Sequence, residues 1–150
     1  MPILAEVFEC FGGKFLINIE LKNYTSIFDP LPIEVSKLIK SYDLVEGVLI
    51  SSFNPFNLPR VRSRIPEARL GLITQPEQAK RWIWRFFDYN SLHPHFSDVD
   101  AVLVSVLHAR NRQVNVWTVD DPQELKRLVD LDVDGIITND PKMSREVLRS

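Results

Sequence analysis

The chain has 150 residues, of which 45% are hydrophobic and 25% charged, and its formal net charge is −2. This length allows one domain with a core of its own, while the charge balance gives no overall signal for binding nucleic acid or an anionic membrane, and no apolar run is long enough for a transmembrane segment. The single cysteine, Cys10, excludes an intrachain disulfide and is typical of a reducing compartment, so we expect a cytoplasmic protein.

The first element in chain order is a helix over residues 3–11, because apolar side chains recur there at helical spacing and two glycines follow. The pattern then predicts six strands, at about residues 15–21, 47–53, 70–74, 91–94, 113–119 and 135–138. Further helices are expected at about residues 33–42, 56–64, 76–89, 97–111 and 121–131, and from Pro141 onward. Ser97 is the expected N-cap of the helix over 97–111, and Asp121 caps the next one.

The regular alternation of strand and helix with short connections predicts a parallel sheet with right-handed crossovers. Two architectures fit this rhythm: an open doubly wound parallel sheet, or a piece of a (β/α)₈ barrel. A complete barrel usually needs about 250 residues, so length by itself favours the open sheet.

The most informative segment is residues 16–22, which alternates strictly between apolar and polar side chains. Strands of a parallel sheet are covered on both faces and usually read as apolar runs. A carboxylate and an ammonium two residues apart on the inner face are therefore costly unless they bind something. Glu20 is a candidate ligand for Mg²⁺ or Ca²⁺, and Lys22 is a candidate charge for a phosphate oxygen. The competing interpretation is a salt-bridged edge strand.

Two further strand ends carry candidate side chains. Trp117 shares a strand face with Asn115 near the carboxyl end of the strand, where α/β folds place their sites, although a large core aromatic would fit the pattern as well. Ser51 and Ser52 end another strand, and because no Gly-x-Ser-x-Gly elbow surrounds them we expect capping roles rather than a nucleophile.

The histidines and an acidic stretch complete the candidates. His93 and His95 could face one side of a short strand and bind a metal ion, whereas His108 falls on a helix. No cysteine, third histidine or glutamate stands at ligand spacing nearby, so we expect structural or surface roles for all three. The aspartates at positions 130, 132 and 134 are expected to form a solvated turn between a helix and a strand rather than a metal site.

Taken together and in this order, the segments resemble the glycerophosphodiester phosphodiesterase family over essentially the whole chain. Residues 18–22, Asn-Ile-Glu-Leu-Lys, are similar to the family's Glu-x-Lys strand, and residues 50–53, Ile-Ser-Ser-Phe, to its Ser-Phe strand end. Residues 117–119 and 134–138 resemble its last two strands. The resemblance reverses the preference drawn from length: we expect residues 1–150 to form a single truncated domain, an incomplete TIM (β/α) barrel equivalent to strands three to eight.

The resemblance also assigns roles to individual residues. It implies that Glu20 is one carboxylate of a divalent-metal site for Mg²⁺ or Ca²⁺ and that Lys22 contacts the scissile phosphate as a catalytic residue. It implies that Trp117 walls the glycerol side of the substrate pocket and that Phe53 lines the same pocket. The parent reaction would be metal-assisted hydrolysis of a glycerophosphodiester to glycerol 3-phosphate and an alcohol.

Several motifs of the family do not occur in these 150 residues. Its first strand ends in a His-Arg pair, its second carries Glu-x-Asp, and a catalytic His-Asp follows; none of the three is found here. Both acid/base histidines and two of the three metal carboxylates are thus missing. Each acid/base group is typically worth roughly 10²–10⁴-fold in rate, and Mg²⁺ and Ca²⁺ want several oxygen ligands. We therefore expect this chain alone to be inactive and to hold a cation weakly or not at all.

Two alternatives stay open beside the truncated phosphodiesterase. One is a non-catalytic domain of the same fold that keeps the pocket for binding a phosphate-like small molecule or for assembly; the other is an unrelated six-stranded α/β binding domain. In either barrel interpretation the strands at residues 15–21 and 135–138 are open edges with apolar faces. Such edges invite pairing with another chain, so we expect a homo-oligomer, with no nucleic acid and no transmembrane segment.

Overall fold

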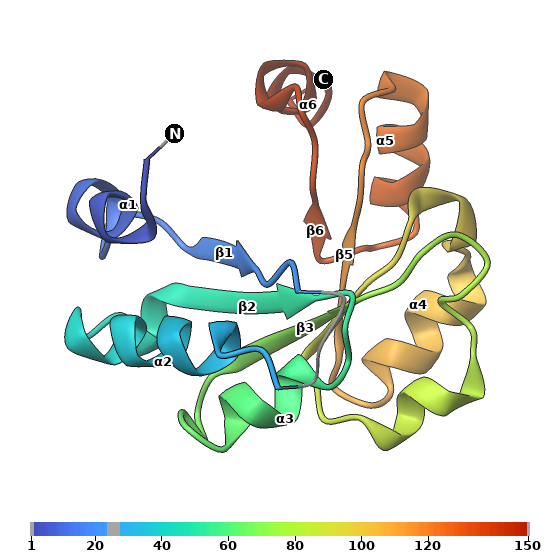
Figure 1. The fold of residues 1–150 in the computed structure, drawn as a ribbon. Helices are drawn as coiled ribbons and strands as arrows, with labels where there is room; N and C mark the ends of the chain where they lie inside the picture. Colours follow the sequence, from blue (N-terminus) through green and yellow to red (C-terminus); the bar gives the residue numbers. More distant parts are fainter. Residues whose placement is uncertain (1, 24–27, 150) are drawn as a thin grey trace. The chain divides into compact units, whose positions relative to one another are not determined.

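The computed structural model describes residues 2–23 and 28–149, and the chain divides into two compact units. The first unit extends to Leu72 and includes Phe86–Tyr89, and the second contains Ile73–Arg85 and the chain from Asn90 onward. Each unit contains parallel strands whose order in the sheet follows their order in the chain (Figure 1).

The first unit is built on strands β1 (Ile17–Glu20), β2 (Val48–Ser52) and β3 (Arg69–Ile73). Its helices are α1 (Leu4–Phe11), α2 (Leu31–Ser41), α3 (Asn57–Arg62) and the short 3₁₀ helix η1 (Val45–Gly47). One face of the sheet is apolar, because Ile19, Ile50 and Leu70 lie side by side in register and are all buried. Leu58 and Val61 of α3 are also fully buried in this unit.

The second unit contains β4 (Ser91–His93), β5 (Gln113–Val116) and β6 (Gly135–Ile136). Its helices are α4 (Ala101–His108), α5 (Pro122–Asp130) and α6 (Pro141–Val147), with the 3₁₀ helix η3 (Phe96–Asp98) between β4 and α4. Leu92 and Val114 pair in register and are buried, as are Leu125 and Leu128 of α5. Burial of one apolar face per strand and per helix stabilises this unit as it does the first.

The α/β class and the six strands of the sequence analysis are confirmed, although β1, β5 and β6 are clearly shorter than predicted. Within each unit the strand order runs without the reversal that marks the switch point of a doubly wound sheet. This order agrees with part of a barrel. No helix among the residues with assigned structure is long and apolar enough to cross a bilayer.

The helix predicted over residues 76–89 is wrong. The structure has turns there and a 3₁₀ helix, η2 (Trp82–Phe86). Glu77 has a φ of 66°, in the left-handed region, which interrupts an α-helix at its first turn. The carboxylate of Asp98 accepts hydrogen bonds from the backbone N–H groups of residues 77, 78 and 79, at 2.8, 3.1 and 3.1 Å, and so holds the turn open.

The predicted start of the next helix is also wrong. α4 begins at Ala101, and its N-cap is Asp100, whose carboxylate accepts a hydrogen bond from the N–H of Leu103 at 2.8 Å. Ser97 instead lies in η3 and bonds to His95. The predicted cap of α5 is confirmed, since Asp121 accepts bonds from the N–H groups of the first helical turn.

Candidate functional site

The predicted charge pair lies at the carboxyl end of β1. Glu20 is the last residue of the strand, in register with Ser51 of β2, and Lys22 follows two positions later. The Lys22 Nζ and the Glu20 Oε2 are 3.6 Å apart, and the two side chains are 68% and 30% exposed. Both charges therefore keep access to water, and the pair stands where a parallel sheet places its ligands.

A second polar pair lies beside it. The Ser51 hydroxyl donates to the Oδ1 of Asn18 at 2.9 Å, and Asn18 shares its strand face with Glu20. Ser52 points to the opposite face, where its Oγ donates to the carbonyl of Leu21 and accepts from the amide of Asn57. Both serine hydroxyls thus donate to acceptors on the neighbouring strand β1 or the residue after it, which agrees with structural roles.

The two predicted aromatic residues belong to different units. Phe53 follows β2 in the first unit and is half-buried. Trp117 follows β5 in the second unit, where its indole Nε1 donates to the carbonyl of His93 at 2.8 Å. The ring of His95 meets the Trp117 ring edge-on, with centroids 5.3 Å apart. The shared orientation of Glu20 and Trp117 stays a prediction.

His93 is a fully buried histidine with two polar side chains beside its ring. Its Nε2 lies 2.8 Å from the Ser91 hydroxyl and 3.1 Å from the Asn115 amide nitrogen. An amide nitrogen can only donate, so Nε2 is the acceptor and the ring is neutral. Burial lowers the pKa of His93 to about 4. His93 is therefore a packed strand residue in this structure rather than a proton donor.

The other titratable candidates have surface roles. The His108 Nε2 lies 2.9 Å from the Asp134 carboxylate, which also accepts from the backbone N–H of Val114 at 2.8 Å. Asp132 has a φ of 60° and forms the turn before β6, as a solvated helix-to-strand connection requires. These contacts agree with the structural roles expected for the histidine and the acidic stretch.

The residues that the structure describes do not by themselves make a complete divalent-cation site. No group of three or more histidine, cysteine, aspartate or glutamate side chains comes together in the part of the chain that the structure describes. Glu20 offers one carboxylate, which forms an ion pair with the Lys22 ammonium. Mg²⁺ and Ca²⁺ need six or more oxygen ligands, of which carboxylates usually supply several, so Glu20 could provide only one part of such a site.

A pocket that the sequence analysis did not predict opens in the second unit beyond the carboxyl end of β5. Its volume is about 490 Å³, and it is lined by Phe96, Thr118, Val119, Asp120, Asp121 and Glu124. The backbone and side chain of Asn139 and the hydroxyl of Thr138 bond to Asp120 and hold the pKa of its carboxyl below the usual range. The one sequence signal was the polar run directly after the strand.

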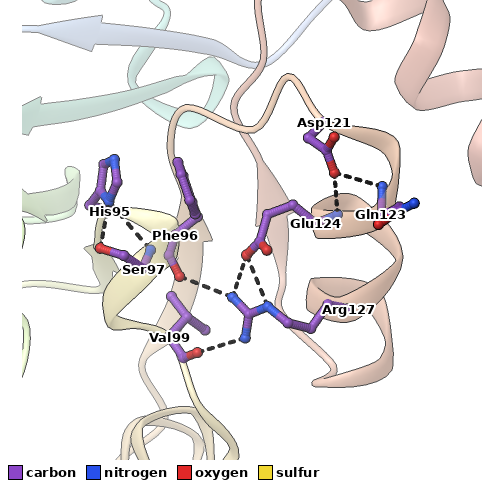
Figure 2. A network of polar contacts seen from close by, with 8 residues as sticks. All are labelled: His95, Phe96, Ser97, Val99, Asp121, Gln123, Glu124 and Arg127. Carbon is purple, nitrogen blue, oxygen red and sulfur yellow. Dashed lines mark hydrogen bonds and ion pairs between the residues drawn. The ribbon is translucent and has the colours of Figure 1, made fainter.

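One wall of this pocket is held by Arg127 of α5. Its guanidinium bonds to the carboxylate of Glu124 and donates to the carbonyls of Phe96 and Val99, at 3.0 and 2.9 Å (Figure 2). The planar group thus ties η3 to α5, the two elements that contribute Phe96 and Glu124 to the pocket lining. His95 and Ser97 bond to each other at the start of the same η3 segment.

Comparison with known proteins shows the same family along the whole chain. The sequence profile of the Glycerophosphoryl diester phosphodiesterase family matches residues 1–143. A glycerophosphodiester phosphodiesterase of Caldanaerobacter subterraneus subsp. tengcongensis is 34% identical over 151 residues, which cover 99% of this chain and 62% of that protein. One from Bacillus altitudinis is 30% identical over 150 residues, covering 94% of this chain and 60% of that protein.

Solved structures agree in fold. A phosphodiesterase from Oleispira antarctica in complex with the product sn-glycerol-3-phosphate has a TM-score of 0.84 and 25% identity, over 99% of this chain and 62% of that chain. A putative glycerophosphodiester phosphodiesterase from Galdieria sulphuraria has a TM-score of 0.86 at 21% identity. This chain thus spans less than two thirds of the relatives' length, and the predicted part-barrel fold is confirmed. The chain belongs to the glycerophosphoryl diester phosphodiesterase family.

Proposed function

We propose that this chain supplies part of the active site of a glycerophosphodiester phosphodiesterase, an enzyme that hydrolyses glycerophosphodiesters to glycerol 3-phosphate and an alcohol. The observation that carries the proposal is the solvent-accessible Glu20–Lys22 pair at the carboxyl end of β1, in a chain of this family. The phosphodiesterase from Oleispira antarctica, which binds sn-glycerol-3-phosphate, supports the same class of ligand.

Each predicted residue has a distinct role in this proposal. The side chain of Lys22 is 68% exposed, and its ammonium is a point charge that attracts a phosphate oxygen. Glu20 keeps that ammonium close to the strand end and offers one oxygen ligand to a divalent cation. Trp117, held by the His93 carbonyl and the His95 ring, presents a fixed apolar wall for the glycerol carbons. Phe53, which directly follows β2, offers a further apolar contact for the substrate.

These 150 residues alone are proposed to bind but not to turn over the substrate. They contain no His-Arg, Glu-x-Asp or His-Asp sequence, and the described residues bring no three metal-ligating side chains together. Loss of one acid/base group costs roughly 10²–10⁴-fold in rate, so the loss of two leaves hydrolysis near the uncatalysed level. A phosphate-binding domain without catalysis is the second candidate, and the same missing groups favour it.

Binding of glycerol 3-phosphate, followed by NMR or calorimetry, tests the ligand class. Lys22→Gln removes the phosphate charge and should weaken binding about tenfold or more, since hydrogen bonds to charged groups contribute about 1.5–3 kcal/mol. Lys37→Gln, an equally exposed lysine on α2, is the matched control and should leave the affinity unchanged. Equal affinity of the Lys22 variant and the unmodified chain would contradict the proposal.

A phosphodiesterase assay with glycerophosphocholine and added Mg²⁺ or Ca²⁺ separates the two candidates. We expect the chain alone to show no activity above background. Turnover that survives repurification and disappears in Glu20→Ala would show that these residues are sufficient for catalysis and would overturn the expectation of inactivity.

A further inference from the structure

The imidazole ring of His95, which follows β4, is held in place by its neighbours in the second unit. His95 pairs with Trp117 in an isolated parallel β-bridge, and the backbone N–H of Phe96 donates to the Trp117 carbonyl at 3.0 Å. The Trp117 ring meets the imidazole edge-on with centroids 5.3 Å apart, and the Phe96 ring lies 4.2 Å away at an angle of 34°. The ring therefore has a defined position at the carboxyl ends of β4 and β5.

The hydrogen bonds of Ser97 determine which nitrogen of the His95 ring carries the proton. The backbone N–H of Ser97 lies 3.3 Å from Nδ1 and can only donate, so Nδ1 is the acceptor. The Ser97 hydroxyl lies 2.8 Å from the same atom and adds a second bond to it (Figure 2). In the neutral imidazole the proton is then on Nε2, which becomes a hydrogen-bond donor.

This Nε2–H group of His95 has no acceptor in the part of the chain that the structure describes. The side chain is half-buried, and Nε2 is not one of the fully buried polar atoms without a partner, so water or a ligand can reach it. His93 differs, because its Nε2 is an acceptor and its ring is fully buried. Polar groups that are fixed in place and left accessible are what proteins use to orient a small ligand.

We propose that His95 is a substrate-binding residue whose Nε2–H donates a hydrogen bond to a hydroxyl group on the glycerol half of the ligand. This inference rests on the proposed function, in which Trp117 is the wall for the glycerol carbons and Lys22 attracts the phosphate. The His95 and Trp117 rings are in contact, so a glycerol placed against Trp117 lies beside the imidazole. The glycerol hydroxyls are the polar groups of the ligand that Lys22 does not bind, and a neutral donor matches them.

The affinities of sn-glycerol 3-phosphate and inorganic phosphate, compared by NMR or calorimetry, test this role. His95→Phe keeps a ring beside Trp117 but removes the donor. It should weaken the binding of glycerol 3-phosphate about three- to tenfold, the usual contribution of a neutral hydrogen bond, and change that of phosphate by less than about twofold. His95→Gln keeps an N–H donor near the position of Nε2 and should retain most of the affinity. His108→Phe makes the same change at a partly exposed histidine of α4 and should leave both affinities unchanged.

Nitrogen-15 NMR of the imidazole gives a readout that packing alone would not move. At about pH 8 an ordinary histidine is neutral, and the free chain should show the Nε2–H form of His95. Addition of glycerol 3-phosphate should shift this nitrogen signal, whereas inorganic phosphate should not.

The outcomes separate the role of His95 from the function on which it rests. Phosphate binding that depends on Lys22, without a preference for glycerol 3-phosphate, would overturn the role of His95 and leave the proposed function standing. So would full affinity in His95→Phe, or a loss in His95→Gln that is as large as in His95→Phe. If neither ligand binds the unmodified chain, the proposed function fails and this inference fails with it.

Discussion

At the scale of single residues, burial sets the chemistry of His93. Its ring accepts from Asn115 and Ser91 on a fully buried strand, and desolvation brings its pKa from the ordinary 6.5 down to about 4. The sequence analysis considered this histidine as a metal ligand beside His95. The structure gives the two histidines different surroundings, because His93 is fully buried on β4 whereas His95 packs its ring against Trp117.

His93 makes stability depend on pH. The unfolded chain takes up a proton on this ring below pH 6.5, but the folded chain does so only below about pH 4, so stability is complete above 6.5 and falls as the pH drops through this window. Each pKa unit corresponds to 1.36 kcal/mol, which predicts a loss of about 2 kcal/mol between pH 7 and pH 5. Urea unfolding at both pH values measures it.

Two histidine variants isolate this contribution. His93→Gln should flatten the dependence between pH 7 and pH 5, even if its stability at pH 7 is lower. His108→Gln should retain the dependence, because that ring is partly exposed and pairs with Asp134 at the surface. A pH dependence unchanged in His93→Gln would contradict the assignment.

Gly135 is the residue that makes room for the Asn115 amide. A Cβ placed on Gly135 would collide with the Asn115 side-chain oxygen, and the same amide donates to His93. Gly135→Ala should therefore destabilise the fold by about 1–3 kcal/mol, the usual effect of overpacking. Gly47→Ala is the control, since its nearest neighbour lies 3.9 Å away and a methyl group fits.

A double-mutant cycle measured by chemical denaturation checks the cause. If the collision is responsible, Gly135→Ala should cost less in an Asn115→Ala background than in the unmodified chain. Equal losses in the two backgrounds would assign the effect to the backbone of β6 instead.

At the scale of elements, local patterns predicted most helices and strands correctly. α5 illustrates why: Asp121 caps it, Pro122 opens it, and its buried leucines recur at helical spacing, so all signals lie within ten residues. The helix prediction over residues 76–89 failed because the interaction that decides the structure there is not local. The acceptor that holds this segment out of an α-helix is Asp98, about twenty positions later, and no local pattern contains it.

Asp98→Ala should therefore release this turn. Three backbone N–H groups lose their acceptor, and we expect a loss of about 1–2 kcal/mol in unfolding free energy, comparable to the loss of a helix cap. Denaturation by urea measures the change, and the tryptophan emission, to which Trp84 with its indole bond to the Gln78 carbonyl contributes, reports the local rearrangement. Glu67→Ala removes an exposed acid from another loop and should have little effect.

At the scale of the whole molecule, the sequence nominated candidate site residues but not their surroundings. Strand patterns singled out Glu20, Lys22 and Trp117, and the family resemblance added Phe53; their roles stay predictions. The contacts of Asn18 with Ser51, and of Arg127 with Phe96, depend on which segments pair in three dimensions. Such pairings connect positions about thirty residues apart and leave no pattern in either segment.

The assembly of the chain stays a prediction that the fold motivates. β1 and β6 are the end strands of the sheet order, and each pairs with one neighbouring strand among the assigned elements. End strands favour pairing with a further strand, so we expect light scattering at tens of micromolar to show a dimer or a larger oligomer. A strict monomer at that concentration would count against it. A charge introduced on β5, as in Val116→Lys, would not test this prediction of assembly, because the Val116 side chain is buried.

The hydrogen bonds of the Arg127 guanidinium couple the local opening of two segments in the second unit, α5 and η3. Because Arg127 binds the carbonyls of Phe96 and Val99, α5 cannot open without freeing η3. In hydrogen–deuterium exchange the amides of both segments should then exchange through one shared event, with the same opening free energy. Arg127→Lys removes the planar guanidinium that bonds to both carbonyls. The two segments should then open separately, so that the amides of η3 exchange first while those of α5 stay protected.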